Sequence, residues 1–274
     1  MADTPFEFPS PSVRIAETGW RDGTARSGER SIAEETAIAF VYDGATEAVM
    51  MASPRDLEDF GIGFSLTEGI IKEPDEIRAL EIVPQELGVE IRMELSEGQR
   101  DVAVARRRHR AGPAGCGLCG IESLESALRP LPKVRAPLKV DADDIHAGMR
   151  ALAAAQALNR ETRAVHAAAY YTPHDKGLVA REDVGRHNAL DKVVGSLARA
   201  GRKAEGGIVL LTSRVSVELV QKTAMLGAPI LAAISAPTAL ALRMADAAGI
   251  CVIGIVRDDG MEVFTHPEFV RGPK

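Results

Sequence analysis

Apolar and polar residues alternate in short stretches over the first third of the chain, a period typical of β-strands. Strands are expected over residues 36–42, 46–51, 77–83, 89–95 and 102–105. The Asp43-Gly44 pair between the first two strands predicts a tight hairpin turn. Ser53 and Pro54 then predict the start of a helix, with Ser53 as its N-cap and apolar residues continuing to Leu66. This part of the chain is therefore expected to be α+β.

From residue 141 the apolar period changes, and helices alternate with strands. Helices are expected over residues 141–158, 188–200, 217–226 and 240–248. Asp141 is expected to cap the first helix, and Gly201, Gly227 and Gly249 to end the other three. Strands are expected over residues 166–172, 177–181, 208–211, 230–234, 250–256 and 261–265. Strands joined through helices pair in parallel, so this part is predicted to be α/β.

Three segments follow from this pattern. Residues 1–29 are expected to hold an N-terminal tail and a first strand. Residues 30–135 form the α+β part, which ends in a cysteine-bearing loop (106–120), a short helix and a proline-rich connector. Residues 136–274 form the α/β part, where a ligand site is expected.

The composition narrows the class of protein. Of the 274 residues 46% are hydrophobic and 26% are charged, as is ordinary for a soluble globular protein. A net charge of −6 and a pI of about 5.6 exclude the basic surface of a nucleic-acid-binding protein. No apolar stretch approaches the ~20 residues of a membrane span, and the N-terminus does not have the pattern of a signal sequence. Because three cysteines do not make a disulfide framework, a cytoplasmic protein with reduced thiols and no membrane partner is expected.

Hydroxyl and arginine side chains follow three strands of the predicted parallel sheet. They lie in residues 212–214, 235–238 and 257–260 and include Ser213, Arg214, Ser235 and Thr238. The carboxyl ends of parallel strands meet at one edge of a sheet, where ligands bind. Hydroxyls, arginines and helix N-termini favour an anion or a nucleotide there. Capping of the following helix would also explain each serine or threonine taken singly.

A second polar segment precedes the helix expected at 188–200. It reads Arg181-Glu-Asp-Val-Gly-Arg-His-Asn188. Arg186 can hold a phosphate, and His187 can shuttle a proton or cap the helix. Lys192, one turn further, is another candidate for an anion. Structural capping and ligand binding are both open for this segment.

Two of the three cysteines stand in a glycine-rich loop, Gly112-Pro-Ala-Gly-Cys-Gly-Leu-Cys-Gly120. Glycine adopts positive φ at little cost, so the loop is expected to be pliable. Residues 106–110 directly upstream read Arg-Arg-Arg-His-Arg, and such cations favour the thiolate forms of Cys116 and Cys119. Paired thiols in a mobile, positively charged loop indicate sulfur chemistry. A solvated basic loop with incidental thiols is the plainer alternative.

Other cysteine chemistries fit less well. One C-x-x-C pair supplies two of the four ligands of a structural zinc site, and no metal site is expected. Zinc deaminases need H-x-E, whereas Ala167 and Ala168 follow His166. The glycine-rich approach differs from a thioredoxin motif, which opens a helix after a strand. Cys251 stands in an apolar strand and is expected to lie in the core.

Several segments together resemble the formate dehydrogenase accessory sulfurtransferase family, FdhD. They are Cys116-Gly-Leu-Cys119-Gly, Asp183-Val-Gly-Arg-His-Asn-Ala-Leu-Asp-Lys192, Ser235-Ala-Pro-Thr238, residues 57–71 and Phe264-Thr-His-Pro267. They occur in order from about residue 30 to residue 270, which is nearly the whole chain. Several long motifs in order are far more specific than a lone C-x-x-C.

The resemblance implies a sulfur carrier that takes persulfide sulfur from a cysteine desulfurase. It passes this sulfur to the bis-molybdopterin guanine dinucleotide form of the molybdenum cofactor, which formate dehydrogenase requires. Cys116 would carry the persulfide and Cys119 would assist, either by forming a disulfide or by relaying the sulfur. The family's cofactor-binding stretch falls on Ile255, Val256, Arg257, Asp258, Asp259 and Gly260.

The resemblance also implies a fold and an assembly. The expected fold is a cytidine-deaminase-like three-layer α/β core with a mixed sheet, plus the smaller α+β N-terminal part. A homodimer is implied, with the cofactor as a bound substrate and no permanently bound group. A non-catalytic chaperone that binds and protects the molybdenum cofactor is the main alternative function.

This chain departs from the family pattern at one motif. Residues 162–166 read Thr-Arg-Ala-Val-His, where the family usually has Thr-Gly-Gly-x-His. The change is expected to alter how this loop approaches the ligand. Asp258 and Asp259 would repel phosphate, so they are expected to face solvent or the N–H donors of guanine.

Overall fold

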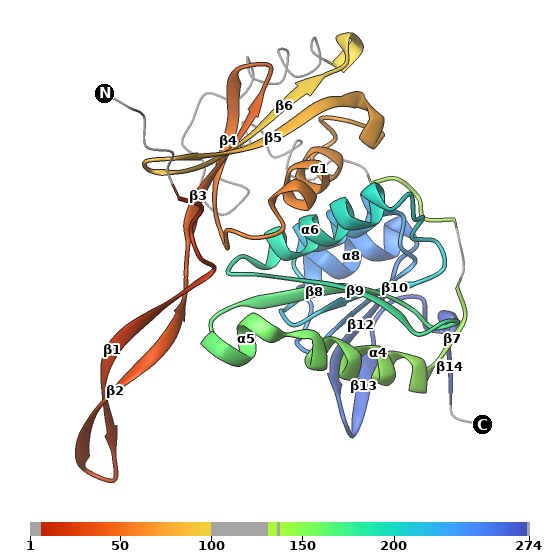
Figure 1. Cartoon of the computed structure of the whole chain (residues 1–274). Coiled ribbons are helices and arrows are strands. Elements are labelled where there is room, and N and C mark those ends of the chain that lie inside the picture. Colours follow the sequence, from red (N-terminus) through yellow and green to blue (C-terminus); the bar gives the residue numbers. More distant parts are fainter. Residues whose placement is uncertain (1–6, 100–130, 136–137, 273–274) are drawn as a thin grey trace.

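The computed structural model describes residues 7–99, 131–135 and 138–272 (Figure 1). Within these ranges the chain forms two main sheets, with helices packed against each, and a separate hairpin. The cysteine loop with Cys116 and Cys119 lies outside the described residues, as do the strand expected at 102–105 and the helix expected at 121–128. No helix of the described residues is long and apolar enough to cross a membrane.

A six-stranded mixed sheet forms the centre of the C-terminal part, in the order β13-β12-β11-β10-β8-β9. Its strands are β8 (His166–Thr172), β9 (Gly177–Asp183), β10 (Ile208–Leu211), β11 (Ile230–Ala233), β12 (Cys251–Arg257) and β13 (Gly260–Val263). The strands β10, β11 and β12 pair in parallel, as the alternation with helices predicted. The strands β8, β9 and β13 join with antiparallel pairing. The predicted mixed α/β class is confirmed, and the likeness to cytidine deaminases stays a prediction.

Helices cover both faces of this sheet (Figure 1). They are α4 (Ala142–Ala155) and α5 (Ala157–Thr162) on one side, and α6 (Arg186–Arg199), α7 (Val217–Leu226) and α8 (Ala239–Ala248) on the other. Alternate residues of β10 face the two layers: Ile208 and Leu210 pack in the cluster with α4, and Val209 and Leu211 in the cluster with α6, α7 and α8. Both faces are therefore buried, which explains why these strands are continuously apolar.

The single helix expected over 141–158 is wrong, because the helix breaks at Gln156 and α5 begins after it. The carboxylate of Glu182 accepts hydrogen bonds from the backbone N–H groups of Leu158 (2.8 Å) and Asn159 (2.7 Å). These N–H groups belong to the first turn of α5. The first N–H groups of a helix have no carbonyl acceptor within the helix, so Glu182 supplies the acceptors here. The predicted cap at Asp141 is confirmed, as part of a capping box with Asp144.

The N-terminal part holds a four-stranded sheet in the order β4-β3-β6-β5. Its strands are β3 (Thr36–Tyr42), β4 (Ala45–Ala52), β5 (Ile77–Gln85) and β6 (Gly88–Leu95). Asp43 and Gly44 both have positive φ, 48° and 79°, so the predicted hairpin turn is confirmed. The helix α1 (Leu57–Thr67) covers one face of this sheet. It packs on α6, so α1 joins the two parts of the molecule (Figure 1).

The helix start predicted at Ser53 is wrong, because α1 begins at Leu57, after Asp56 in the left-handed conformation. Ser53 is fully buried and serves a different contact. Its backbone N–H donates to the Asp183 carboxylate (3.0 Å), and its hydroxyl oxygen accepts from the Val184 N–H (3.1 Å). Ser53 therefore makes long-range hydrogen bonds to β9 and the residue after it, and it does not cap α1.

A long hairpin of β1 (Ser12–Arg21) and β2 (Thr24–Ala33) projects from the body of the molecule (Figure 1). A strand was expected within residues 1–29, whereas β2 and its pairing along the whole of β1 were not predicted. The remaining short elements are η1 (Pro74–Glu76), β7 (Val140–Asp141), η2 (Pro267–Phe269) and β14 (Val270–Arg271). The division into three segments stays a prediction.

Candidate functional site

One edge of the six-stranded sheet brings the predicted ligand segments together. The Val215 N–H donates to the Ala236 carbonyl (3.3 Å), and the Thr238 N–H donates to the Val215 carbonyl (3.0 Å). The Ile255 N–H in turn donates to the Ser235 carbonyl (3.3 Å). The segments that follow β10 and β11 therefore meet the end of β12 at this edge. The first residues of α6, α7 and α8 follow the strand ends here as well.

The hydroxyl and arginine side chains at this edge have different surroundings. Ser213 is buried, and its hydroxyl donates to the Arg214 carbonyl (3.1 Å). Arg214 itself is exposed, and Ser235 is half-buried. Thr238 caps α8, because its hydroxyl oxygen accepts from the Ala241 N–H (3.3 Å). Arg214 and Ser235 are therefore the side chains of this set with most freedom to meet a ligand.

The stretch from Ile255 to Gly260 ends β12 and turns into β13. Ile255 has a φ of 52° beside an irregularity in the β12–β13 pairing, which is an outlier for a β-branched residue. The Val256 side chain is buried in the core, so its contact with a ligand would be through the backbone. Arg257, Asp258 and Asp259 are exposed.

Arg186 and His187 open α6 at the same edge. The Nε atom of Arg186 is buried and has no hydrogen-bond partner among the described residues. His187 Nε2 lies 3.3 Å from Ser216 Oγ and 3.8 Å from the carboxylate of Glu218. Burial, together with the positive charges of Arg186 and Lys222, lowers the pKa of His187 to about 4, so this imidazole is neutral at neutral pH.

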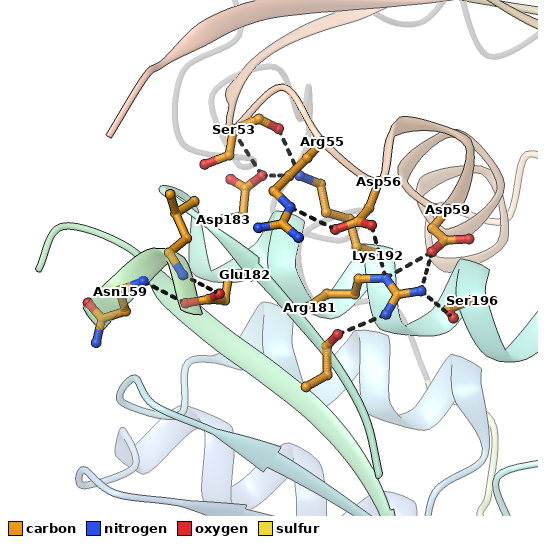
Figure 2. Close-up of polar contacts among 12 residues, drawn as sticks. Ser53, Arg55, Asp56, Asp59, Asn159, Arg181, Glu182, Asp183, Lys192 and Ser196 are labelled. Atoms are coloured by element: carbon orange, nitrogen blue, oxygen red, sulfur yellow. Dashed lines mark hydrogen bonds and ion pairs between the residues drawn. The ribbon is translucent and has the colours of Figure 1, made fainter. Parts of the chain in front are cut away.

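The rest of the Arg181–Asn188 segment holds the two parts of the molecule together (Figure 2). Arg181 pairs with Asp59 of α1 at 2.7 Å. Asp183 accepts from Lys192 Nζ (2.6 Å) and also from the Gly185 N–H and the Asn188 amide. The expectation that Lys192 binds an anionic ligand is therefore wrong, since Lys192 is fully buried against Asp183.

A cavity of about 280 Å³ lies where α4 and α5 meet the strand ends. It is lined by Met149, Leu152, Ala153, Gln156, Asn159, Val165, His166, Thr212 and Ile234. The sequence drew attention to His166, but not to Gln156 and Asn159. No local signal in the sequence marks these two residues, because the helix break at Gln156 depends on the distant Glu182. A smaller hollow of about 110 Å³ shares Gln156 and is lined by Arg55, Asp56 and Arg181 among others.

Arg163 keeps the backbone shape that a glycine would favour at this motif. It ends α5 in the left-handed conformation, with φ 60° and ψ 25°. Glycine adopts this conformation without strain, whereas a residue with a side chain does so at a cost of about 1 kcal/mol. The loop that leads to His166 therefore keeps a left-handed residue at position 163, although the two glycines of the family pattern are missing.

The third cysteine is a core residue, as predicted. Cys251 is fully buried, and burial raises the pKa of its thiol to about 12. Such a thiol stays protonated and does not act as a nucleophile. Over the residues that the structure describes, no group of three or more His, Cys, Asp and Glu side chains gathers as a metal site.

Comparison with known proteins supports the resemblance seen in the motifs. A model described as the FdhD/NarQ family matches residues 33–271. The sulfur carrier protein FdhD of Agrobacterium fabrum is 55% identical over 256 residues, which are 93% of this chain and 94% of that protein. The sulfur carrier protein FdhD of Bordetella petrii is 47% identical over 249 residues, 91% of this chain and 89% of that protein.

A solved structure has the same fold. The crystal structure of a "putative formate dehydrogenase accessory protein" from Desulfotalea psychrophila matches with a TM-score of 0.75 and 28% sequence identity. The match covers 95% of this chain and 99% of that chain. Both sheets of the molecule therefore belong to one shared architecture.

Proposed function

Because the chain belongs to the FdhD/NarQ family, we propose that it is a sulfur carrier that serves the maturation of formate dehydrogenase. The observation that carries this proposal is the extent of the family match. Residues 33–271 include both cysteines of the C-x-x-C loop and every segment that meets at the sheet edge. The proposal therefore joins a sulfur-bearing loop and a ligand-binding edge in one chain.

Cys116 is the proposed sulfur-bearing residue. Its thiolate attacks the terminal sulfur of a persulfide on a cysteine desulfurase, a new S–S bond forms on Cys116, and the desulfurase cysteine leaves as a thiolate. Cys119 then has two possible roles. It can attack the Cys116 sulfur of the persulfide, so that a Cys116–Cys119 disulfide forms and the outer sulfur leaves as hydrosulfide; the Cys119 thiol is oxidised and the released sulfur is reduced. It can instead accept the sulfur in a relay.

The sheet edge is the proposed docking site for the acceptor, the bis-molybdopterin guanine dinucleotide cofactor. The residues concerned are Ile255, Val256, Arg257, Asp258, Asp259, Gly260, Ser213, Arg214, Ser235, Thr238, Arg186 and His187. The exposed Arg214 and Arg257 suit its phosphates. The exposed Asp258 and Asp259 suit N–H donors of guanine. The cofactor is a transient substrate in this scheme and passes on to the dehydrogenase.

The proposal includes an assembly and a location. We place the protein in the cytoplasm as a homodimer, with a cysteine desulfurase as donor and formate dehydrogenase as recipient. The order of the central strands, with β8 between β9 and β10, supports a cytidine-deaminase-like core. In that core the ligand lies beyond the strand ends, which is where the candidate residues gather.

Mass spectrometry tests the sulfur-carrier step. The intact protein is incubated with a cysteine desulfurase and cysteine, and a mass gain of about 32 Da per sulfur, removed by reductant, is expected. Cys116→Ala should lose the gain. Cys251→Ala is the matched control and should keep it, because the Cys251 thiol is buried and protonated. A gain that survives in Cys116→Ala would contradict the proposed role.

The chaperone alternative predicts a different outcome for formate dehydrogenase. A protein that only binds and protects the cofactor would still support activation of the dehydrogenase after Cys116→Ala. A sulfur carrier would not. Activation by the Cys116→Ala variant at the level of the unmodified protein would therefore favour the chaperone.

A further inference from the structure

The β1–β2 hairpin has little support from the rest of the described chain. Its two strands pair only with each other, and its tip extends away from the body of the molecule (Figure 1). At its base the Ser12 hydroxyl donates to the Glu161 carboxylate (2.8 Å), and the Arg30 guanidinium donates to the Thr162 carbonyl (3.3 Å). A two-stranded hairpin on its own is marginally stable in water at best. A further surface that covers the hairpin would therefore stabilise it.

Exposed apolar side chains gather on the hairpin. Of the ten large hydrophobic side chains that are exposed in the described ranges, four belong to it: Val13, Ile15, Trp20 and Ile32. The pairing register opposes Val13 to Ile32, and Ile15 lies two residues along β1. Because side chains alternate between the faces of a strand, these three lie on one face of the hairpin. Exposed apolar residues gathered in this way indicate a contact with another protein surface.

This face of the hairpin is also positively charged, and we call it the basic face. The same register places three arginines and one carboxylate on it: Arg21, Arg26, Arg30 and Glu17. The surplus is positive although the chain as a whole has a net charge of −6. A surface that fits the basic face should therefore be acidic and should also expose apolar residues.

The chain itself has such a surface on its four-stranded sheet. One face of this sheet packs on α1 through residues such as Ile38 and Ile91. The alternation of side chains directs other residues to the opposite face, which we call the outer face. These residues are apolar in β4 and acidic in β5 and β6: Val49, Met51, Glu81, Glu90 and Glu94. Arg92 on this face pairs with Glu90 at 2.7 Å, so the exposed carboxylates of Glu81 and Glu94 leave a surplus of negative charge.

From this complementarity we propose that the basic face of the hairpin binds the outer face of the four-stranded sheet in a second copy of this chain. When both copies exchange their hairpins, the two contacts are equal and the pair is closed. Only Glu34 and Glu35 separate β2 from β3, so each hairpin starts directly beside its own sheet. The two contacts can therefore lie next to each other about a two-fold axis. The inference rests on the homodimer of the proposed function and adds the surfaces through which the two copies meet.

Charge reversal on either surface tests the contact. The hairpin variant combines Arg21→Glu with Arg26→Glu, and the sheet variant combines Glu81→Arg with Glu94→Arg. Each should weaken dimerisation by about tenfold or more, because like charges then face each other. Sedimentation velocity of the full chain over a range of concentrations measures the dimerisation constant.

A mixture of the two variants separates the proposed exchange from a general loss of folding. In a mixed pair, one contact carries both sets of reversed charges and the other contact carries neither. Dimers should therefore return to near the level of the unmodified chain. The matched control combines Lys203→Glu with Arg243→Glu, two exposed positions outside both surfaces, and should dimerise as the unmodified chain does.

Several outcomes would overturn the inference. They are an unmodified chain that stays monomeric, a hairpin or sheet variant that dimerises as tightly as the unmodified chain, and a mixture that does not restore dimers. A hairpin variant that stays dimeric but no longer takes up sulfur from the desulfurase would show that the hairpin meets that protein instead. The mass gain on Cys116 is measured separately. A chain that takes up sulfur as a monomer therefore keeps the sulfur-carrier proposal and loses the homodimer and this contact.

Discussion

At the scale of single residues, Ile255 shows the conflict between backbone preference and site geometry most clearly. Its φ of 52° is one that a β-branched residue rarely adopts, and its N–H donates to the Ser235 carbonyl at the edge of the six-stranded sheet where the candidate residues lie. Strained residues of this kind persist where the surrounding structure imposes them, and they gather at functional sites. The strain therefore supports a role for this stretch that its apolar side chain alone would not indicate.

The positive φ of Ile255 predicts that a glycine at this position is more stable than an alanine, the reverse of the order in a regular strand. In a regular strand, alanine is more stable than glycine by about 0.5–1 kcal/mol. At positive φ glycine is favoured, so Ile255→Gly should be more stable than Ile255→Ala by about 1 kcal/mol. Urea unfolding of both variants measures this difference. The same pair at Ile253, a regular and buried position of β12, should show the ordinary order. Ile255→Ala proving the more stable would show that the strain is absent.

Sequence reasoning found the chemistry-bearing residues better than it found their partners. Arg181, Asp183 and His187 were candidates because of their types and spacing. Which of them is free depends on groups far along the chain, such as Asp59 for Arg181. Local spacing holds no information about such contacts. Arg186 and His187 therefore remain candidates after the structure is known, whereas Lys192 does not.

At the scale of elements, apolar period and turn residues predicted most of the strands and helices. The strands β3, β8 and β10 have the predicted bounds, because each is a continuous apolar run closed by turn residues. The β1–β2 hairpin was missed in part because it packs no apolar face into a core: its apolar residues, such as Val13, Ile15 and Trp20, are exposed. The break at Gln156 was missed because it depends on the distant Glu182.

The contact of α1 with α6 depends on two reciprocal glycines. A Cβ atom at Gly63 would lie 1.7 Å from the Asp191 carbonyl oxygen, and one at Gly195 would lie 1.8 Å from that of Asp59. The rigid backbone cannot give way, so Gly63→Ala should lower the free energy of unfolding by about 3 kcal/mol or more. Urea unfolding measures the loss. Gly206→Ala is the control, because a Cβ atom there meets nothing within 4 Å, and it should change stability by less than about 0.5 kcal/mol. A stable Gly63→Ala variant would mean that the helices are further apart.

At the scale of the whole molecule, charged groups with little exposure connect three apolar cores. One core lies between α1 and the four-stranded sheet, and the others lie on the two faces of the six-stranded sheet. Between them Lys222 contacts Asp191 at 3.0 Å, and Arg181 and Arg199 both contact Asp59. Buried ion pairs add little net stability, but removing one partner lowers stability strongly because the other charge stays buried without a partner. This junction therefore fixes how α1 and the four-stranded sheet are attached to the six-stranded sheet.

Lys192 tests this junction at its most buried point (Figure 2). Its Nζ donates to the Asp183 carboxylate (2.6 Å) and to the Ser53 carbonyl (2.9 Å), and its side chain is fully buried. Lys192→Met keeps much of the packing but leaves the buried Asp183 carboxylate without its positive partner. The variant should therefore lower the free energy of unfolding by about 3–5 kcal/mol. Urea unfolding followed by circular dichroism measures this loss. Lys203→Met, at an exposed position, should change stability by less than about 0.5 kcal/mol. If the Lys192→Met variant unfolds at the same urea concentration as the unmodified chain, the attachment of the two parts does not depend on this ion pair.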